Sequence, residues 1–139
     1  MIGARVKLAS VVMFVAELER SVTFYTDLFA LQVTIKNDSA ALLVGPDGSQ
    51  LYLRAIGDKA THPVATIGPQ YVLWTAESDA DLTTCETYLR SKSSHVSVTD
   101  ERGFRLLEAR DPDDVPVIVT FPGPDEVARE RIISRIYGW

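Results

Sequence analysis

Apolar and polar residues follow two different periodicities along the first 55 residues, and each predicts a different kind of element. Residues 8–16 are almost continuously apolar and rich in β-branched side chains, which predicts a buried strand. Beyond them Leu18, Val22 and Tyr25 recur at helical spacing, which predicts a helix with one buried stripe. Shorter apolar runs then predict strands at 31–36, 40–45 and 50–55, with the turn sequence GPDG at 45–48 between the last two.

The same order of elements recurs in the second half of the chain. Residues 70–76 predict a strand, and Asp79 is the expected N-cap of a helix with Leu82, Cys85 and Leu89 on its apolar stripe. His95 begins the next expected strand. Strands are predicted at 95–100, 104–110 and 115–121, and the turn sequence DPDD at 111–114 echoes GPDG.

This repetition predicts the organisation of the whole chain. We expect a single domain over residues 1–139, made of two strand-helix-strand-strand-strand modules at 8–55 and 70–122. Residues 56–69 are rich in glycine and proline, which predicts a linker. Residues 123–139 predict a C-terminal helix, whose apolar face includes Ile132, Ile133 and Ile136.

Composition narrows the class of protein. With 139 residues, 46% of them apolar, the chain can bury a core without disulfides, and it has one cysteine. The net charge of −5 argues against nucleic acid and anionic membranes as partners. The apolar run after Arg5 and Lys7 resembles the core of a signal peptide, but it lacks a clear cleavage site and is too short to span a membrane. A cytoplasmic protein is the expectation.

The segment SVVMFVAELERSVTFYTDLFAL, residues 10–31, carries a resemblance to a known family. It is similar to the opening strand and helix of the vicinal oxygen chelate superfamily, which includes glyoxalase I, extradiol dioxygenases and bleomycin-binding proteins. Glu17 stands where that family usually has Asp, and DPDD resembles its D-P-D-G turn. The resemblance covers roughly residues 8–122. It implies an α+β fold in which two tandem βαβββ modules form facing curved mixed sheets around a central cavity.

The same resemblance implies four positions for metal ligands, and none of them holds a ligand here. Enzymes of the family place His, Glu or Gln there, whereas this chain has Ser10, Tyr52, Tyr71 and Ile118. Shifting the alignment by one residue would offer Gln70 in place of Tyr71, which does not restore a site. The two histidines, His62 in the linker and His95, are expected at the surface. We therefore expect no metal and no other cofactor.

If Ser10 faces the cavity, alternation along the strands places other side chains there too. The candidate ligand-binding residues are Ser10, Phe14, Tyr52, Arg54, Tyr71 and Ile118. Together they predict an aromatic and apolar pocket with few polar groups, and the alternative is that these side chains fill the space as core. Arg54 could bind a ligand anion, pair with Asp58 or Glu108, or lie in solvent. Glu108 could also act as a general base if buried, and Cys85 is expected to be an inert core thiol.

Two classes of function fit these residues. The first is a metal-independent small-molecule binding protein of the glyoxalase/bleomycin-resistance type, which sequesters a drug or secondary metabolite and works as a homodimer. The second is a metal-free enzyme that acts on a small metabolite by acid/base chemistry through a tyrosine, Arg54 or Glu108. A regulatory or structural subunit without a ligand is a third class. No nucleophile-base pair is visible in the sequence.

Overall fold

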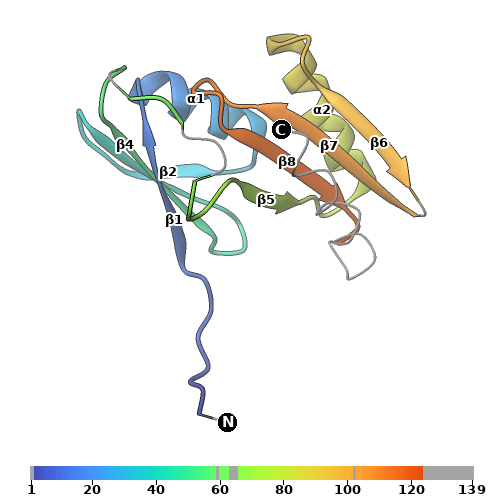
Figure 1. Ribbon diagram of the computed structural model, residues 1–139, viewed down its shortest axis with the longest axis horizontal. Helices are drawn as coiled ribbons and strands as arrows, with labels where there is room; N and C mark the ends of the chain where they lie inside the picture. The colour runs from blue at the N-terminus through green and yellow to red at the C-terminus, as the bar shows by residue number, and fades with distance from the viewer. Residues whose placement is uncertain (1, 59, 63–65, 102, 124–139) are drawn as a thin grey trace. The chain divides into compact units, whose positions relative to one another are not determined.

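The chain divides into two compact units, residues 1–61 and 62–139, and each is built around one four-stranded mixed sheet (Figure 1). The structure, a computed structural model, describes residues 2–58, 60–62, 66–101 and 103–123. The boundary between the units falls within the predicted linker. No helix in the described ranges is long and apolar enough to cross a membrane.

The first unit contains one helix and four strands. They are β1 (Ser10–Val15), α1 (Leu18–Leu28), β2 (Gln32–Lys36), β3 (Ala40–Val44) and β4 (Gln50–Ala55). The strands are ordered β1-β4-β3-β2 in the sheet, with β1 parallel to β4 and the other pairs antiparallel. This is the predicted βαβββ module, and its strands lie where the apolar runs place them.

The core of the first unit lies between α1 and one face of this sheet. Leu18, Val22 and Tyr25 are buried at the predicted helical spacing, and α1 packs on β3 and β4. From the sheet, Leu43, Leu51 and Leu53 are fully buried beneath the helix. Since successive residues of a strand point to opposite faces, the residues that alternate with these leucines along β3 and β4 point to the other face of the sheet.

The second unit repeats this plan with the order β5-β8-β7-β6. Its elements are β5 (Val72–Thr75), α2 (Asp79–Lys92), β6 (Ser97–Glu101), β7 (Phe104–Arg110) and β8 (Pro116–Phe121). Again the first and last strands are parallel and the remaining pairs antiparallel. The two modules predicted from the repeated pattern, and the α+β class, are thereby confirmed.

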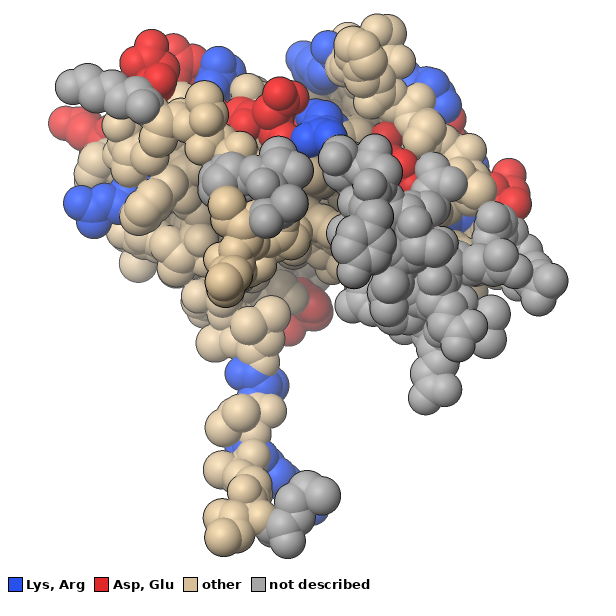
Figure 2. All heavy atoms as spheres, in the orientation of Figure 1, with Lys and Arg blue, Asp and Glu red and all other residues tan. Residues whose placement is uncertain are grey.

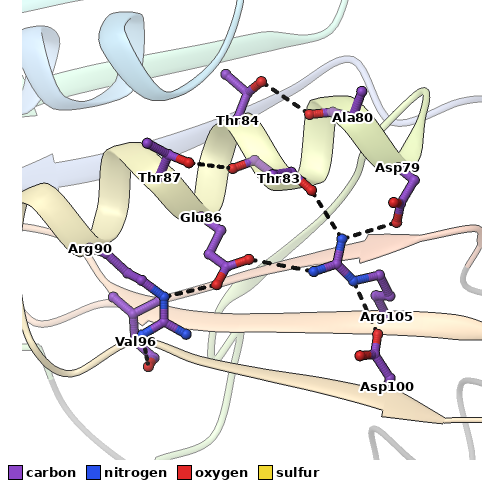
Figure 3. A network of polar contacts seen from close by, with 10 residues as sticks. All are labelled: Asp79, Ala80, Thr83, Thr84, Glu86, Thr87, Arg90, Val96, Asp100 and Arg105. Carbon is purple, nitrogen blue, oxygen red and sulfur yellow. Dashed lines mark hydrogen bonds and ion pairs between the residues drawn. The ribbon is translucent and has the colours of Figure 1, made fainter.

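Polar contacts hold α2 to its sheet, as Figure 3 shows. The guanidinium of Arg105, on β7, donates to Asp79 Oδ1 at 3.0 Å and to Thr83 Oγ1 at 3.1 Å, both on α2. It also pairs with Glu86 Oε1 at 3.4 Å and, across the sheet, with Asp100 Oδ1 on β6 at 3.0 Å. One arginine therefore ties a helix and two strands together.

Several predicted details were wrong. Ser78, rather than Asp79, is the N-cap of α2, since its hydroxyl accepts the Asp81 N–H at 3.0 Å. Tyr71 was expected on a strand and lies one residue before β5, because that strand is shorter than predicted. His95 was expected to begin a strand and lies two residues before β6. The predicted C-terminal helix lies outside the described residues, apart from Gly123, which is not in a helix.

Candidate functional site

The face of the first sheet that does not carry α1 brings together most of the predicted site residues. Strand pairing places Ser10 beside Gln50, Val12 beside Tyr52, and Phe14 beside Arg54. These three pairs begin three rows of side chains across the sheet. On β3 the rows continue with Val44 beside Gln50, Leu42 beside Tyr52 and Ala40 beside Arg54. On β2, Gln32 lies beside Val44 and Ile35 beside Leu42. We call this surface the open face; it comprises Ser10, Val12, Phe14, Gln32, Ile35, Ala40, Leu42, Val44, Gln50, Tyr52 and Arg54.

Large apolar side chains are exposed on the open face. Val12 is 60% exposed, Phe14 62% and Ile35 63%, whereas the leucines on the opposite face of the same sheet are fully buried. Tyr52 and Leu42, which lie between Val12 and Ile35 in the middle row of the open face, are half-buried. Scattered exposed apolar residues are ordinary, but a contiguous row of them on a sheet is typical of a surface that binds something.

Two polar groups on the open face have no partner within the described part of the chain. Arg54 is exposed and its guanidinium makes no ion pair or hydrogen bond with the described residues of its own unit, so Asp58 does not pair with it. The hydroxyl of Tyr52 likewise has no hydrogen-bond partner among these residues. A planar cation and a phenol are therefore available to a bound molecule.

The corresponding face of the second sheet carries a buried apolar cluster. Phe104, Leu106 and Ile118 form a buried apolar cluster, and the half-buried Tyr71 and Leu73 pack against it. Ile118 is only 2% exposed. The burial of this residue favours the core-filling alternative in the second unit, and the first unit leaves the equivalent face open. The shared central cavity between the modules stays a prediction.

The residues at the four metal-ligand positions do not fit a metal. A serine hydroxyl, two phenols and an alkyl chain offer none of the imidazole or carboxylate donors that divalent cations need. The alternative donor, Gln70, donates from Nε2 to the carbonyls of Thr66 and Gly68 at 2.6 and 2.8 Å, which fixes its side chain on its own loop. No group of three His, Cys, Asp or Glu side chains that could hold a metal occurs among the described residues.

The remaining candidate residues lie apart from the open face. Cys85 is buried on α2, and desolvation raises the pKa of its thiol to about 11, as expected for an inert core cysteine. Glu108 is half-buried on β7, beside Ile118 in the second unit. His95 is exposed, as predicted, and His62 is half-buried rather than fully at the surface.

Sequence reasoning missed the contribution of β2 and β3 to the open face. Leu42 lies beside Tyr52, and Ile35 lies beside Leu42, so the aromatic residue stands in a continuous apolar row. The place of Leu42 beside Tyr52 could have been predicted, because the turn at 45–48 joins β3 and β4 and fixes their register. The place of Ile35 could not have been predicted, since the pairing of β2 with β3 shifts by one residue between Val33 and Ile35.

Two mixed four-stranded sheets of identical strand order, each with one helix, define a protein of two tandem βαβββ modules. The sequence profile of the Glyoxalase/Bleomycin resistance protein/Dioxygenase superfamily matches residues 7–119, so the chain belongs to this superfamily. This confirms the resemblance inferred from residues 10–31. No curated protein sequence matches the chain significantly.

Solved structures agree on the fold. A glyoxylase/bleomycin resistance protein/dioxygenase domain from Frankia sp. EAN1pec is similar, with a TM-score of 0.73 and 19% identity over 84% of this chain and 98% of that chain. Oxidase ChaP-H2 has a TM-score of 0.67 and 16% identity over 86% and 96%. Lactoylglutathione lyase from Agrobacterium tumefaciens has a TM-score of 0.60 and 17% identity over 84% and 94%. At such identities the likeness concerns the fold alone.

Proposed function

We propose that this chain is a metal-independent small-molecule binding protein of the glyoxalase/bleomycin-resistance type, which sequesters a drug or secondary metabolite. The observation that carries the proposal is the open face of the first unit. It combines exposed apolar side chains with the unpartnered polar groups of Arg54 and Tyr52. Binding sites for small molecules have this character, an apolar lining with a few polar groups that orient the ligand.

The proposed ligand contacts are five of the six residues predicted from the sequence, since Ile118 is buried, and the first unit contributes four of the five. Ser10, Phe14, Tyr52 and Arg54 share the open face. Tyr71 and Ile118 belong to the cluster of the second unit, where Tyr71 is half-buried and therefore partly accessible. The ligand would lie flat on the rows of the first sheet, since the exposed rings and alkyl groups there offer a broad surface for contact.

The chemistry of the open face favours binding over catalysis. Among its described residues there is no carboxylate, imidazole or thiol, so it offers no conventional general base and no nucleophile-base pair. Solved structures of similar fold include an oxidase and a lyase, but the residues of this chain at the four ligand positions do not suit a divalent metal. A binding protein needs none of those groups.

The partners and location follow the same proposal. We propose a homodimer, because the sequence of residues 123–139 carries Ile132, Ile133 and Ile136 at a spacing that predicts one apolar face, which pairing would cover. Charges suit a freely diffusing protein with a small-molecule ligand: in Figure 2 acidic and basic side chains are interspersed over the visible described surface, and the net charge is −5. A cytoplasmic location is part of the proposal, consistent with the single buried thiol of Cys85.

Native mass spectrometry of the untagged full chain, purified from its own host, tests the proposal. The expected spectrum contains a non-covalent small-molecule adduct that is lost on denaturation, and elemental analysis of the same sample finds no stoichiometric metal. The variant Phe14→Ala should carry less of the adduct, and Lys36→Met, which changes a residue outside the open face, should carry as much as the wild type. Bare chain in every preparation, combined with no binding of the neutral aromatic probe N-phenyl-1-naphthylamine, would contradict the proposal.

A further inference from the structure

We infer that the ligand of the open face is an organic anion, with a flat apolar body and one carboxylate, sulfonate or phosphate group. The inference rests on the proposed function and deepens it by naming the chemical class of the ligand. It is carried by the placement of charge. Among the described residues of the open face Arg54 is the one charged side chain, and no acid neutralises it.

Arg54 is well suited to bind an anion. Its guanidinium presents donors in a planar fork that matches two oxygens of a carboxylate, sulfonate or phosphate. The structure leaves these donors without any described partner, whereas Arg105 of the second unit makes ion pairs with three acids. Elsewhere in the first unit, the cation Lys36 pairs with Glu19 and so is already neutralised. Among the described residues of the open face, Arg54 is therefore the charged group that remains available to a ligand.

The surroundings of Arg54 define the rest of the ligand. Phe14 lies directly beside it on the adjacent parallel strand, at a strand spacing of about 4.8 Å. Its neighbour on β3, Ala40, is small, apolar and buried. An aromatic ring stacked on Phe14 and Tyr52 would thus place an acidic substituent within reach of the guanidinium. A cationic ligand would be repelled, and a small inorganic anion would leave the apolar row uncovered.

A second copy of the same face is a poorer occupant. Symmetric pairing of two open faces would place two Arg54 side chains in one interface, with no acid among the described residues of either face to pair with them. Like charges brought together in this way are destabilising, so the exposed face with its lone cation favours a small anion over self-association through this surface.

Two fluorescent probes that share one aromatic body test the inference on the full chain. 1-Anilinonaphthalene-8-sulfonate carries a sulfonate, and N-phenyl-1-naphthylamine is the same ring system without it. Arg54→Met should weaken binding of the sulfonate probe about tenfold, the loss expected for a charge-assisted contact of ~1.4 kcal/mol. Binding of the neutral probe should change by less than about twofold, because Met keeps the apolar stem.

Two further variants serve as controls. Lys36→Met removes a cation from the same unit but away from the open face, so it should leave the affinities of both probes unchanged. Phe14→Ala should weaken both probes about fivefold, because both stack on the ring. Urea unfolding of each variant checks that the fold is retained, which the exposure of Arg54 and Phe14 leads us to expect.

The outcomes separate this inference from the proposed function. If both probes bind and Phe14→Ala weakens both, but Arg54→Met does not weaken the sulfonate probe selectively, the anionic class is wrong and the binding function stands. If neither probe binds, both are overturned. Light scattering adds a third outcome: a dimer that dissociates when Arg54 or Phe14 is changed would assign the face to a second copy and overturn the inference.

Discussion

The contacts of Arg105 allow a stability prediction with a worked magnitude. The side chain is 24% exposed and meets three carboxylates, on Asp79, Glu86 and Asp100. The pairs with Asp79 and Asp100 contribute about 0.5 kcal/mol each, because those carboxylates are largely exposed. Glu86 is 22% exposed, so this pair is less screened by water and contributes about 1 kcal/mol. Arg105→Met should therefore lower the free energy of unfolding by about 2 kcal/mol.

Urea unfolding followed by circular dichroism measures this loss. The melting temperature should fall by about 4–8 °C for a chain of this size. High salt should shrink the difference between wild type and variant, since the Debye length falls to about 3 Å at 1 M. Because the hydrogen bond to Asp79 raises the pKa of Arg105 further above its ordinary value, the arginine stays charged and its contribution is not lost as the pH rises through the neutral and mildly alkaline range.

Two comparisons test whether the geometry of the Arg105 contacts, and not its charge alone, accounts for the loss of stability in Arg105→Met. Arg105→Lys keeps the charge but cannot reach the three carboxylates in one fork, so it should recover less than about half of the lost stability. Lys36→Met removes another cation that bridges a helix and a strand, but with a single exposed pair, and should cost at most about 0.5 kcal/mol. Full stability in Arg105→Lys, or an equal loss in Lys36→Met, would refute the reasoning.

Four further predictions follow from single features. Untagged protein should hold no stoichiometric zinc, nickel, iron or manganese after mild chelation, because Ser10, Tyr52, Tyr71 and Ile118 are not metal ligands; retained metal in elemental analysis would contradict this. Light scattering should give the mass of a homodimer, and a monomer at high micromolar concentration would count against it. The pKa of Cys85 is raised from 9.0 to about 11, so the stability it contributes is complete below pH 9 and is lost as the pH rises through about 11; Cys85→Ala should flatten that decline in urea midpoints. Asp114 has a φ of 69°, where glycine is preferred, so Asp114→Gly should raise the unfolding free energy by about 0.5–1 kcal/mol, and a lowered melting temperature would show the strain argument to be wrong.

The fold was predictable because its information is local and repeated. Helical spacing in the first helix and short apolar runs between turns each specify one element, and the order of elements recurs. Boundaries were less predictable where the deciding contacts involve side chains. Gln70 bonds to its own loop carbonyls and does not extend β5, and the hydroxyl of Ser78 caps α2 one residue before the predicted cap. Composition alone does not distinguish such polar residues from their neighbours.

The candidate site was predictable only in part, for a physical reason. Alternation placed Phe14, Tyr52 and Arg54 on one face, and the register of β1 with β4 agrees. The sequence could not indicate that this face stays open while Ile118 is buried. Both β4 and β8 are apolar and β-forming, and alternation along a strand shows which residues share a face but not which other parts of the chain pack on that face.

The difference between the two units bears on how a metal-site fold could become a binding fold. A metal centre shared by two modules needs donors from both, so each module must keep polar residues on the face that meets the metal. Without those donors this constraint disappears and the two faces are free to diverge. Here Ile118 and its apolar neighbours form a buried cluster on the face of the second sheet. The first unit leaves Phe14 and Arg54 exposed and Tyr52 half-buried, so the proposed binding chemistry would be concentrated on one module. Substitutions on the open face should therefore alter ligand affinity with little loss of stability, whereas equivalent substitutions at Ile118 should act first on folding.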